Sequence, residues 1–231
     1  MNNYDICGLL VGMEPDGITQ RQAEKYLSNI NSEPDMIVKP LKKEDYDSKT
    51  RYYPFEQYQY LTCGVDFYRK LLDFNGIMLH ASAVVVDDGA YLFSAASGTG
   101  KSTHTQLWLE LFGERAFILN DDKPAIRIID NAIYAYGTPW SGKYDISVNK
   151  AVRLKGICFL NRGKSNKIER LDFQTAVIRL YHGTLKKLDA NQTQKSFDII
   201  EQIVKGIPVY EMFCTPDIEA AKIAFNTMKD N

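Results

Sequence analysis

One short stretch of this chain combines the residue types that bind phosphate groups. Gly98 and Gly100 follow an apolar segment, and Lys101 and Ser102 come directly after the second glycine. Glycines let the backbone curl until successive N–H groups face one anion, a lysine reaches the outer phosphates of a nucleotide, and a serine hydroxyl can bind Mg²⁺. The residues that we predict to bind phosphate are Ser97, Gly98, Thr99, Gly100, Lys101, Ser102 and Thr103.

The stretch departs from the phosphate-loop pattern G-x-x-x-x-G-K-[ST] at its first position, which holds Ala95. Because a Cβ atom disfavours positive φ, we expect Ala95 to have a negative φ. A plain glycine-rich turn is the alternative interpretation. The strand pattern before the loop, the helix pattern after it and two acidic residues downstream favour nucleotide binding.

The two acidic residues are Asp121 and Asp122, which follow the apolar run 116–119 and an asparagine. In phosphate-loop folds, an acid of this kind binds the Mg²⁺ that accompanies the nucleotide. Two turn-forming aspartates after a strand are the alternative. We therefore predict a Mg²⁺ site formed by Ser102 and one of these aspartates.

A tryptophan and two basic residues are further candidates. Trp140 lies in the Gly- and Pro-containing segment 137–143, which ends in Lys143. We predict that Trp140 forms one wall of the site and that Lys143 contacts a phosphate or a carboxylate. A packed turn with a solvent-exposed lysine is the alternative. Arg162 either clamps a phosphate or lies on the surface.

Strand and helix patterns surround these residues. Residues 81–86 and 91–94 are β-branched or aromatic runs separated by a turn, which predicts a hairpin that leads into the loop. Apolar spacing predicts one long helix over residues 55–74, with Gly64 in its middle. A second hairpin is predicted over residues 125–136. Further strands are predicted over residues 153–160 and 208–214, and further helices over residues 102–112, 173–181, 193–205 and 216–228.

The sequence indicates that the first 49 residues form a separate small unit. They predict a strand over residues 4–11, a short helix that begins with a capping box formed by Thr19 and Gln22, and a short strand over residues 36–38. We therefore predict an α/β appendage over residues 1–49 and a core over residues 50–231. Because two hairpins exclude a purely parallel sheet, the predicted fold class is α/β, with a mixed, largely antiparallel sheet and flanking helices around the loop.

Composition limits the classes of partner. The 28 basic and 29 acidic residues give a net charge of −1, which disfavours nucleic acid and anionic membranes as partners. No apolar run is long enough to span a membrane and the N-terminus lacks the features of a signal peptide, so we predict a cytoplasmic location. Four scattered cysteines and three histidines suggest neither a disulfide framework nor a zinc cluster, and we expect reduced, mostly buried thiols.

Three segments taken together, 79–83 with His80, 97–102 and 120–122, resemble the HPr serine kinase/phosphorylase and ATP-dependent phosphoenolpyruvate carboxykinase superfamily. The resemblance covers roughly residues 76–214. It implies that the loop holds the phosphates of ATP and that His80, placed in a strand, lines the reacting end of the site. It also implies that one aspartate binds Mg²⁺ with Ser102, and that the other accepts the proton of the acceptor. We assign the base to Asp121 and the metal ligand to Asp122, although the sequence does not distinguish them.

The reaction that this resemblance implies is transfer of the γ-phosphoryl group of ATP to a serine-type hydroxyl, in a protein, a peptide or a small molecule. The predicted catalytic residues are Asp121, Asp122, His80 and Lys101. The chain lacks a signature of the HPr enzymes, so its acceptor need not be HPr, and it is much shorter than a carboxykinase. A nucleotide-sensing subunit without turnover is the alternative, and a small carboxykinase-like enzyme is a more remote one. The HPr enzymes are oligomers, so the resemblance also allows a homo-oligomer.

Overall fold

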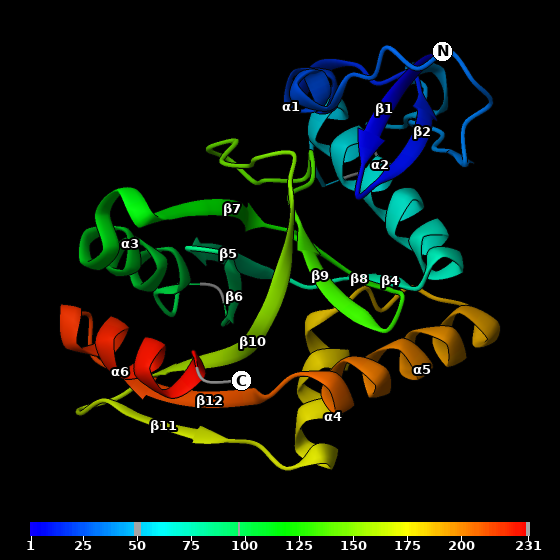
Figure 1. The fold of residues 1–231 in the computed structure, drawn as a ribbon. Helices are drawn as coiled ribbons and strands as arrows, with labels where there is room; N and C mark the ends of the chain where they lie inside the picture. Colours follow the sequence, from blue (N-terminus) through cyan, green and yellow to red (C-terminus); the bar gives the residue numbers. More distant parts are fainter. Residues whose placement is uncertain (49–51, 97, 230–231) are drawn as a thin grey trace.

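The computed structural model describes residues 1–48, 52–96 and 98–229, which form a three-stranded sheet, a nine-stranded sheet and the helices around them (Figure 1). The large sheet has the strand order β4-β8-β9-β10-β6-β5-β7, with β12 paired to β10 and β11 paired to β12. Among the described strand pairs of this sheet, only β10–β6 and β10–β12 are parallel. A mixed, largely antiparallel sheet with flanking helices is therefore present, as the hairpins predicted. The strands of the large sheet are β4 (Gly76–Met78), β5 (Ala81–Val86), β6 (Gly89–Ser94), β7 (Ala116–Asp122), β8 (Ala125–Ile129), β9 (Ala132–Tyr136), β10 (Ala151–Arg162), β11 (Lys167–Arg170) and β12 (Val209–Cys214).

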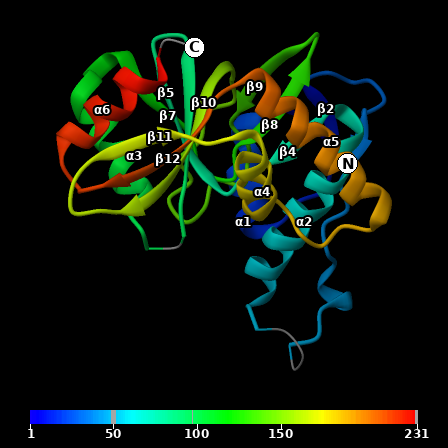
Figure 2. The ribbon, with the colours of Figure 1, turned by 90° about the horizontal axis from the view of Figure 1, so that it is seen from below.

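Helices cover both faces of this sheet. Figure 2 shows α3 beside α6 at one end of the molecule and α4 beside α5 at the other. Alternate residues of β5 pack on opposite faces of the sheet. Val84 packs in the cluster that contains Trp108 of α3, whereas Val85 packs in the cluster that contains Leu180 of α4. Burial on both faces explains the uninterrupted apolar runs in the sequence. The helices are α2 (Phe55–Leu71), α3 (Lys101–Phe112), α4 (Phe173–Gly183), α5 (Ala190–Gly206) and α6 (Ile218–Met228), with 3₁₀ turns η2 (Lys43–Asp45), η3 (Leu72–Phe74) and η4 (Gly113–Arg115).

The small sheet differs from its prediction. Residues 4–11 do not form one strand but belong to a hairpin of β1 (Asn2–Ile6) and β2 (Leu9–Met13), to which β3 (Met36–Ile37) adds in parallel. Cys7 and Gly8 both have positive φ and form the tight turn that reverses the chain. The predicted capping box is also wrong: Asp16 caps α1 (Gly17–Ala23), which passes into η1 (Glu24–Tyr26), and Thr19 is buried within the helix.

The small sheet and α2 share one apolar cluster. Tyr4 and Val11 of the sheet pack in the same cluster as Phe67 of α2 and Trp140 of the segment that follows β9. The boundary predicted at residue 49 lies outside the described residues. The division into residues 1–49 and 50–231 stays a prediction.

Other elements match their patterns with shifted ends. Both predicted hairpins and the long helix are confirmed, whereas β10 is longer than residues 153–160, and α6 begins at Ile218 after an Asp217 cap, not at Pro216. The sequence patterns did not predict β4 and β11, which are short. All four cysteines are free, and Cys7, Cys63 and Cys158 are buried. No helix in the described residues combines the length and apolar character needed to cross a membrane.

Candidate functional site

The glycine-rich loop, residues 95–100, joins the end of β6 to the start of α3. Gly98 has a φ of 76° and Gly100 a φ of 114°, a region that residues with a Cβ rarely adopt. A Cβ atom at either glycine would meet nothing within 4 Å, so the backbone conformation and not the available space requires glycine. Ala95 is not among the described residues with positive φ, which confirms the expectation for it. Ser97, a predicted phosphate-binding residue, lies outside the described residues.

The first turn of α3 is open toward the loop. Gly100 precedes the helix without a side-chain cap, and the first turn contains no acidic residue. The first intrahelical bond runs from the N–H of His104 to the carbonyl of Gly100, at 2.9 Å. The preceding N–H groups, among them those of Ser102 and Thr103, therefore extend from the positive end of a three-turn helix. This arrangement stabilises an anion that binds at the start of the helix.

Arg162 contacts the loop itself. It lies at the end of β10, which runs parallel to β6, so that both strands end at the same edge of the sheet. Its Nη2 atom donates a hydrogen bond to the carbonyl of Gly98 at 2.6 Å. Arg162 is exposed, as the surface alternative from the sequence expected, and its guanidinium group also holds the loop backbone.

Ser102 and Asp121 meet on the helix side of β7. The hydroxyl of Ser102 donates to Asp121 Oδ1 at 3.3 Å and to Oδ2 at 3.2 Å. Hydroxyl and carboxylate oxygens are the hard ligands that Mg²⁺ prefers, and this ion commonly takes its other ligands from water and phosphate. The two side chains therefore fit a Mg²⁺ ion. Within the described residues, no group of three or more His, Cys, Asp or Glu side chains is placed to hold a metal.

Asp122 faces the other side of β7 and belongs to a different group of side chains. Its Oδ1 atom lies 3.3 Å from His80 Nε2 and 2.7 Å from Lys123 Nζ. Lys101 Nζ lies 3.3 Å from the same His80 nitrogen. One histidine nitrogen thus lies between a carboxylate and the lysine of the loop, and its protonation decides whether it donates to Asp122 or accepts from Lys101.

The resemblance placed His80 in a strand, but the structure does not. His80 forms a bend between β4 and β5, where its N–H donates to the carbonyl of Gly183 and its own carbonyl accepts from the Ser94 hydroxyl. These bonds satisfy the backbone outside the strand ladder. The bend brings the imidazole close to the end of β7.

The charges of the group depend on one another. Burial alone would raise the pKa of Asp122, but the hydrogen bond from His80 and the charge and hydrogen bond of Lys123 outweigh it and lower that pKa to about 2. Burial lowers the pKa of Lys101, and the carboxylates of Asp122 and Asp121 oppose this effect only in part. A phosphate next to Lys101 would favour its charged form further.

The buried side chain of Asn120 fixes the end of β7. Its Oδ1 atom accepts hydrogen bonds from the N–H groups of Asp122 at 3.1 Å and Lys123 at 2.9 Å, and its Nδ2 atom donates to the Thr138 carbonyl. Sequence reasoning did not single out Lys123. Its position directly after the two aspartates was the available signal.

Segment 137–143 lies behind the two aspartates. Trp140 is buried, its ring is stacked on Phe67 with centroids 4.7 Å apart, and its Nε1 donates to the Tyr60 carbonyl. A Cβ atom on Gly142 would lie 3.1 Å from that of Asp122, so the segment contacts the site through its backbone. Lys143 is exposed, with Nζ 5.4 Å from the centre of the Tyr144 ring. Binding of a phosphate by Lys143 stays a prediction.

Two cavities flank the loop. One, of about 420 Å³, lies beside Gly100, Thr103 and Arg162. The other, of about 560 Å³, lies on the side of His80 and Lys123 and includes Arg179 and His182 of α4. Arg179 forms an ion pair with Glu211, whose carboxylate also accepts a hydrogen bond from Asn161. The sequence alone does not connect His182 with the loop, because only the fold brings α4 to this cavity.

Comparisons with known proteins add little to this geometry. No protein-family model and no curated protein matches the chain. In structure, the chain is similar to the HPr(Ser) kinase/phosphatase from Coxiella burnetii, with 12% sequence identity and a TM-score of 0.39 over 66% of this chain and 94% of that chain. A similarity of this size says nothing about activity.

Proposed function

We propose that this chain is an ATP-dependent kinase that transfers the γ-phosphoryl group to a serine-type hydroxyl of a protein, a peptide or a small molecule. One observation carries the proposal. The two aspartates at the end of β7 reach different partners on the two sides of this strand, Ser102 on one side and His80 on the other. Phosphoryl transfer needs a metal position and an acceptor position on either side of the transferred group.

The loop and the first turn of α3 bind the phosphates of ATP in this proposal. The N–H groups that precede His104 face the phosphates, and Lys101 neutralises charge on the β- and γ-phosphates. The bond from Arg162 to the Gly98 carbonyl supports this role, because it fixes the backbone of the loop at Gly98. Positioning of this kind is the main contribution of a protein to phosphoryl transfer.

Ser102 and Asp121 hold Mg²⁺ in this proposal. Their mutual contact favours Asp121 as the metal ligand, the reverse of the assignment that the sequence suggested. The ion offsets the negative charge that develops on the β- and γ-phosphate oxygens.

Asp122 and His80 act at the acceptor. The acceptor oxygen forms a bond to the γ-phosphorus while the bond from that phosphorus to the β,γ-bridging oxygen breaks, and ADP leaves. Asp122 accepts the proton of the hydroxyl. The lowered pKa of Asp122 keeps it ionised at neutral pH, and a weak base suffices where the hydroxyl loses its proton late. The cavity of about 560 Å³ beside His80 is the place for the acceptor.

Turnover with a panel of acceptors tests the proposal. Purified full-length protein is incubated with Mg²⁺ and labelled ATP, with and without serine-bearing proteins, peptides and free serine, and ADP is measured. We expect at least one acceptor to raise ADP release well above that of the Lys101→Ala variant, while Lys222→Ala, an exposed cation on α6, behaves as wild type. If no acceptor does so, the kinase proposal fails, and a nucleotide-sensing subunit without turnover is the remaining alternative.

A further inference from the structure

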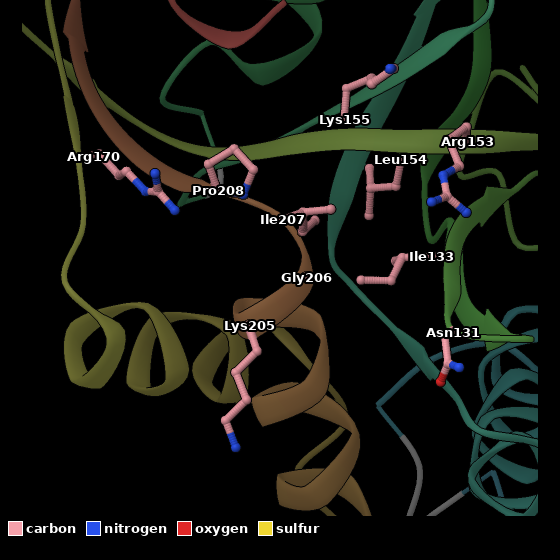
Figure 3. A pocket seen from close by; sticks show the side chains of 10 residues that line it. All are labelled: Asn131, Ile133, Arg153, Leu154, Lys155, Arg170, Lys205, Gly206, Ile207 and Pro208. Carbon is pink, nitrogen blue, oxygen red and sulfur yellow. The ribbon is translucent and has the colours of Figure 1, made fainter. Parts of the chain in front are cut away.

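A third cavity lies away from the loop, beside the part of β10 that lies between its partner strands β9 and β12. This groove of about 410 Å³ is lined by residues of β9 and the turn before it, of β10 and β11, and of the end of α5 with the segment that connects it to β12 (Figure 3). None of its lining residues takes part in the site described above.

The groove exists because β10 pairs with two different strands along one of its two edges. On that edge, β9 pairs with residues 151–153 and β12 pairs with residues 157–162, while β6 occupies the opposite edge. Residues 154–156 therefore lie between two partner strands. In the part of the chain that the structure describes, no strand pairs with them on this edge, and the opening is a consequence of the topology.

The lining is apolar at its base and cationic at its rim. Ile133, Leu154 and Ile207 are buried at the base. Figure 3 shows the guanidinium groups of Arg153 and Arg170 extending toward the groove from opposite sides. Among the described lining residues none is acidic, and neither arginine forms an ion pair with a described carboxylate. Arg153 instead lies over the Tyr134 ring, at 5.5 Å from its centre.

The other charges near the groove do not cancel these two. Lys155 and Lys205 also line it, but Figure 3 shows their ammonium groups pointing away. Lys205 pairs with Glu201 at 3.2 Å, and it offsets the negative end of α5, which stops at this point. Glu169, next to Arg170, pairs with Lys167 at 2.7 Å. Two arginines without a described carboxylate partner thus face one space.

We infer that this groove binds a small molecule that carries at least two phosphate groups. Each guanidinium fork matches the oxygens of one phosphate, and the apolar base excludes water from beneath the ligand. A cavity of this volume takes a small molecule and not a folded partner. The inference does not depend on the kinase proposal, since it uses none of the residues around the loop.

Binding of inorganic tripolyphosphate to full-length protein tests the inference. Calorimetry is done in the Lys101→Ala background, which weakens binding at the loop. We expect one site, and a loss of affinity of at least about tenfold when Arg153→Gln or Arg170→Gln is added, because each removes a charge-assisted bidentate contact. Arg21→Gln removes an exposed cation on α1 and should change the affinity by less than about twofold.

Hydrogen exchange of the wild-type chain locates the site without any substitution in the groove. Tripolyphosphate should protect amides in residues 153–157 and 206–209. Protection at the loop alone, or unchanged affinity in both arginine variants, overturns the inference. Citrate bound as tightly as tripolyphosphate overturns the assignment to phosphate groups.

Discussion

Asp121 and Asp122 are adjacent in the sequence, but their side chains contact different residues in the fold. Successive side chains of a strand point to opposite faces, so one carboxylate reaches the helix that follows the loop and the other reaches the bend before β5. Ser102 contacts the first, and His80 and Lys123 contact the second. We therefore assign metal binding and proton transfer to different aspartates.

Separate substitutions distinguish the two aspartates. Asp121→Asn should raise the Mg²⁺ concentration that half-saturates ATP binding by at least about tenfold, because it removes a metal ligand. Asp122→Asn should change that concentration by less than about threefold, yet lower phosphoryl transfer by about 10² to 10⁴-fold. Mg²⁺ titrations of ATP binding and initial rates measure both. The opposite pattern would return the metal to Asp122, as the sequence suggested.

His104 makes stability depend on pH. Its side chain is 3% exposed, its Nε2 atom accepts a hydrogen bond from Trp108 Nε1, and burial lowers its pKa from 6.5 to about 4. Between these values the unfolded chain binds a proton that the folded chain does not. The free energy of unfolding should therefore fall as the pH is lowered from 6.5 toward 4, by about 2 to 3 kcal/mol at pH 4.5.

The His104→Gln variant is the reference for this effect, because glutamine keeps an acceptor for Trp108 and does not titrate. Urea unfolding at pH 7 and pH 4.5 should show the larger loss of stability in the wild type. Equal losses in the two proteins would mean that His104 carries no such dependence.

At the scale of elements, α2 and segment 137–143 pack together through a glycine. Gly64 lies in the middle of α2, and a Cβ atom there would come within 2.8 Å of the Trp140 ring. Trp140 is also stacked on Phe67 of the same helix. The glycine that weakens the helix pattern in the sequence is thus required by the close approach of an indole, and this approach supports the segment behind Asp122.

Gly64→Ala should destabilise the protein by up to about 2 kcal/mol. Alanine would gain about 1 kcal/mol of helix propensity, but overpacking against Trp140 costs about 1 to 3 kcal/mol. Chemical denaturation measures the change, with Thr62→Ala in the same helix as a control that should be near neutral. Adding Trp140→Phe should recover part of the loss. A stabilised Gly64→Ala variant would show that the ring moves away freely.

The sequence predicted the helices and strands that are marked by apolar spacing and turn residues within a short segment. Both hairpins, the long helix and α3 follow from apolar spacing and turn residues. The hairpin of β1 and β2 was missed because Cys7 gives no turn signal, although its φ is positive in the fold. β4 and β11 were missed because three or four residues carry too little pattern, and their pairing with distant strands defines them.

At the scale of the whole molecule, the candidate site lies at one end of the large sheet, where segments that are distant in the sequence come close to one another. Loop, helix start and aspartates were predicted from residue types, and the structure brings Ser102 to Asp121 and Lys101 to His80. Lys123, the bond from Arg162 to the loop and the cavity beside α4 were not predicted, because they depend on strand order and not on local sequence.

Equilibrium binding of Mg²⁺–ATP tests the central claim most directly. Isothermal titration of the wild type should show one nucleotide site at the loop, Lys101→Ala should bind at least about thirtyfold more weakly, and Lys222→Ala should match the wild type. Omission of Mg²⁺ should weaken binding to the wild type far more than to Asp121→Asn. A wild-type chain that does not bind Mg²⁺–ATP, or a Lys101→Ala variant that binds it equally well, would contradict the account.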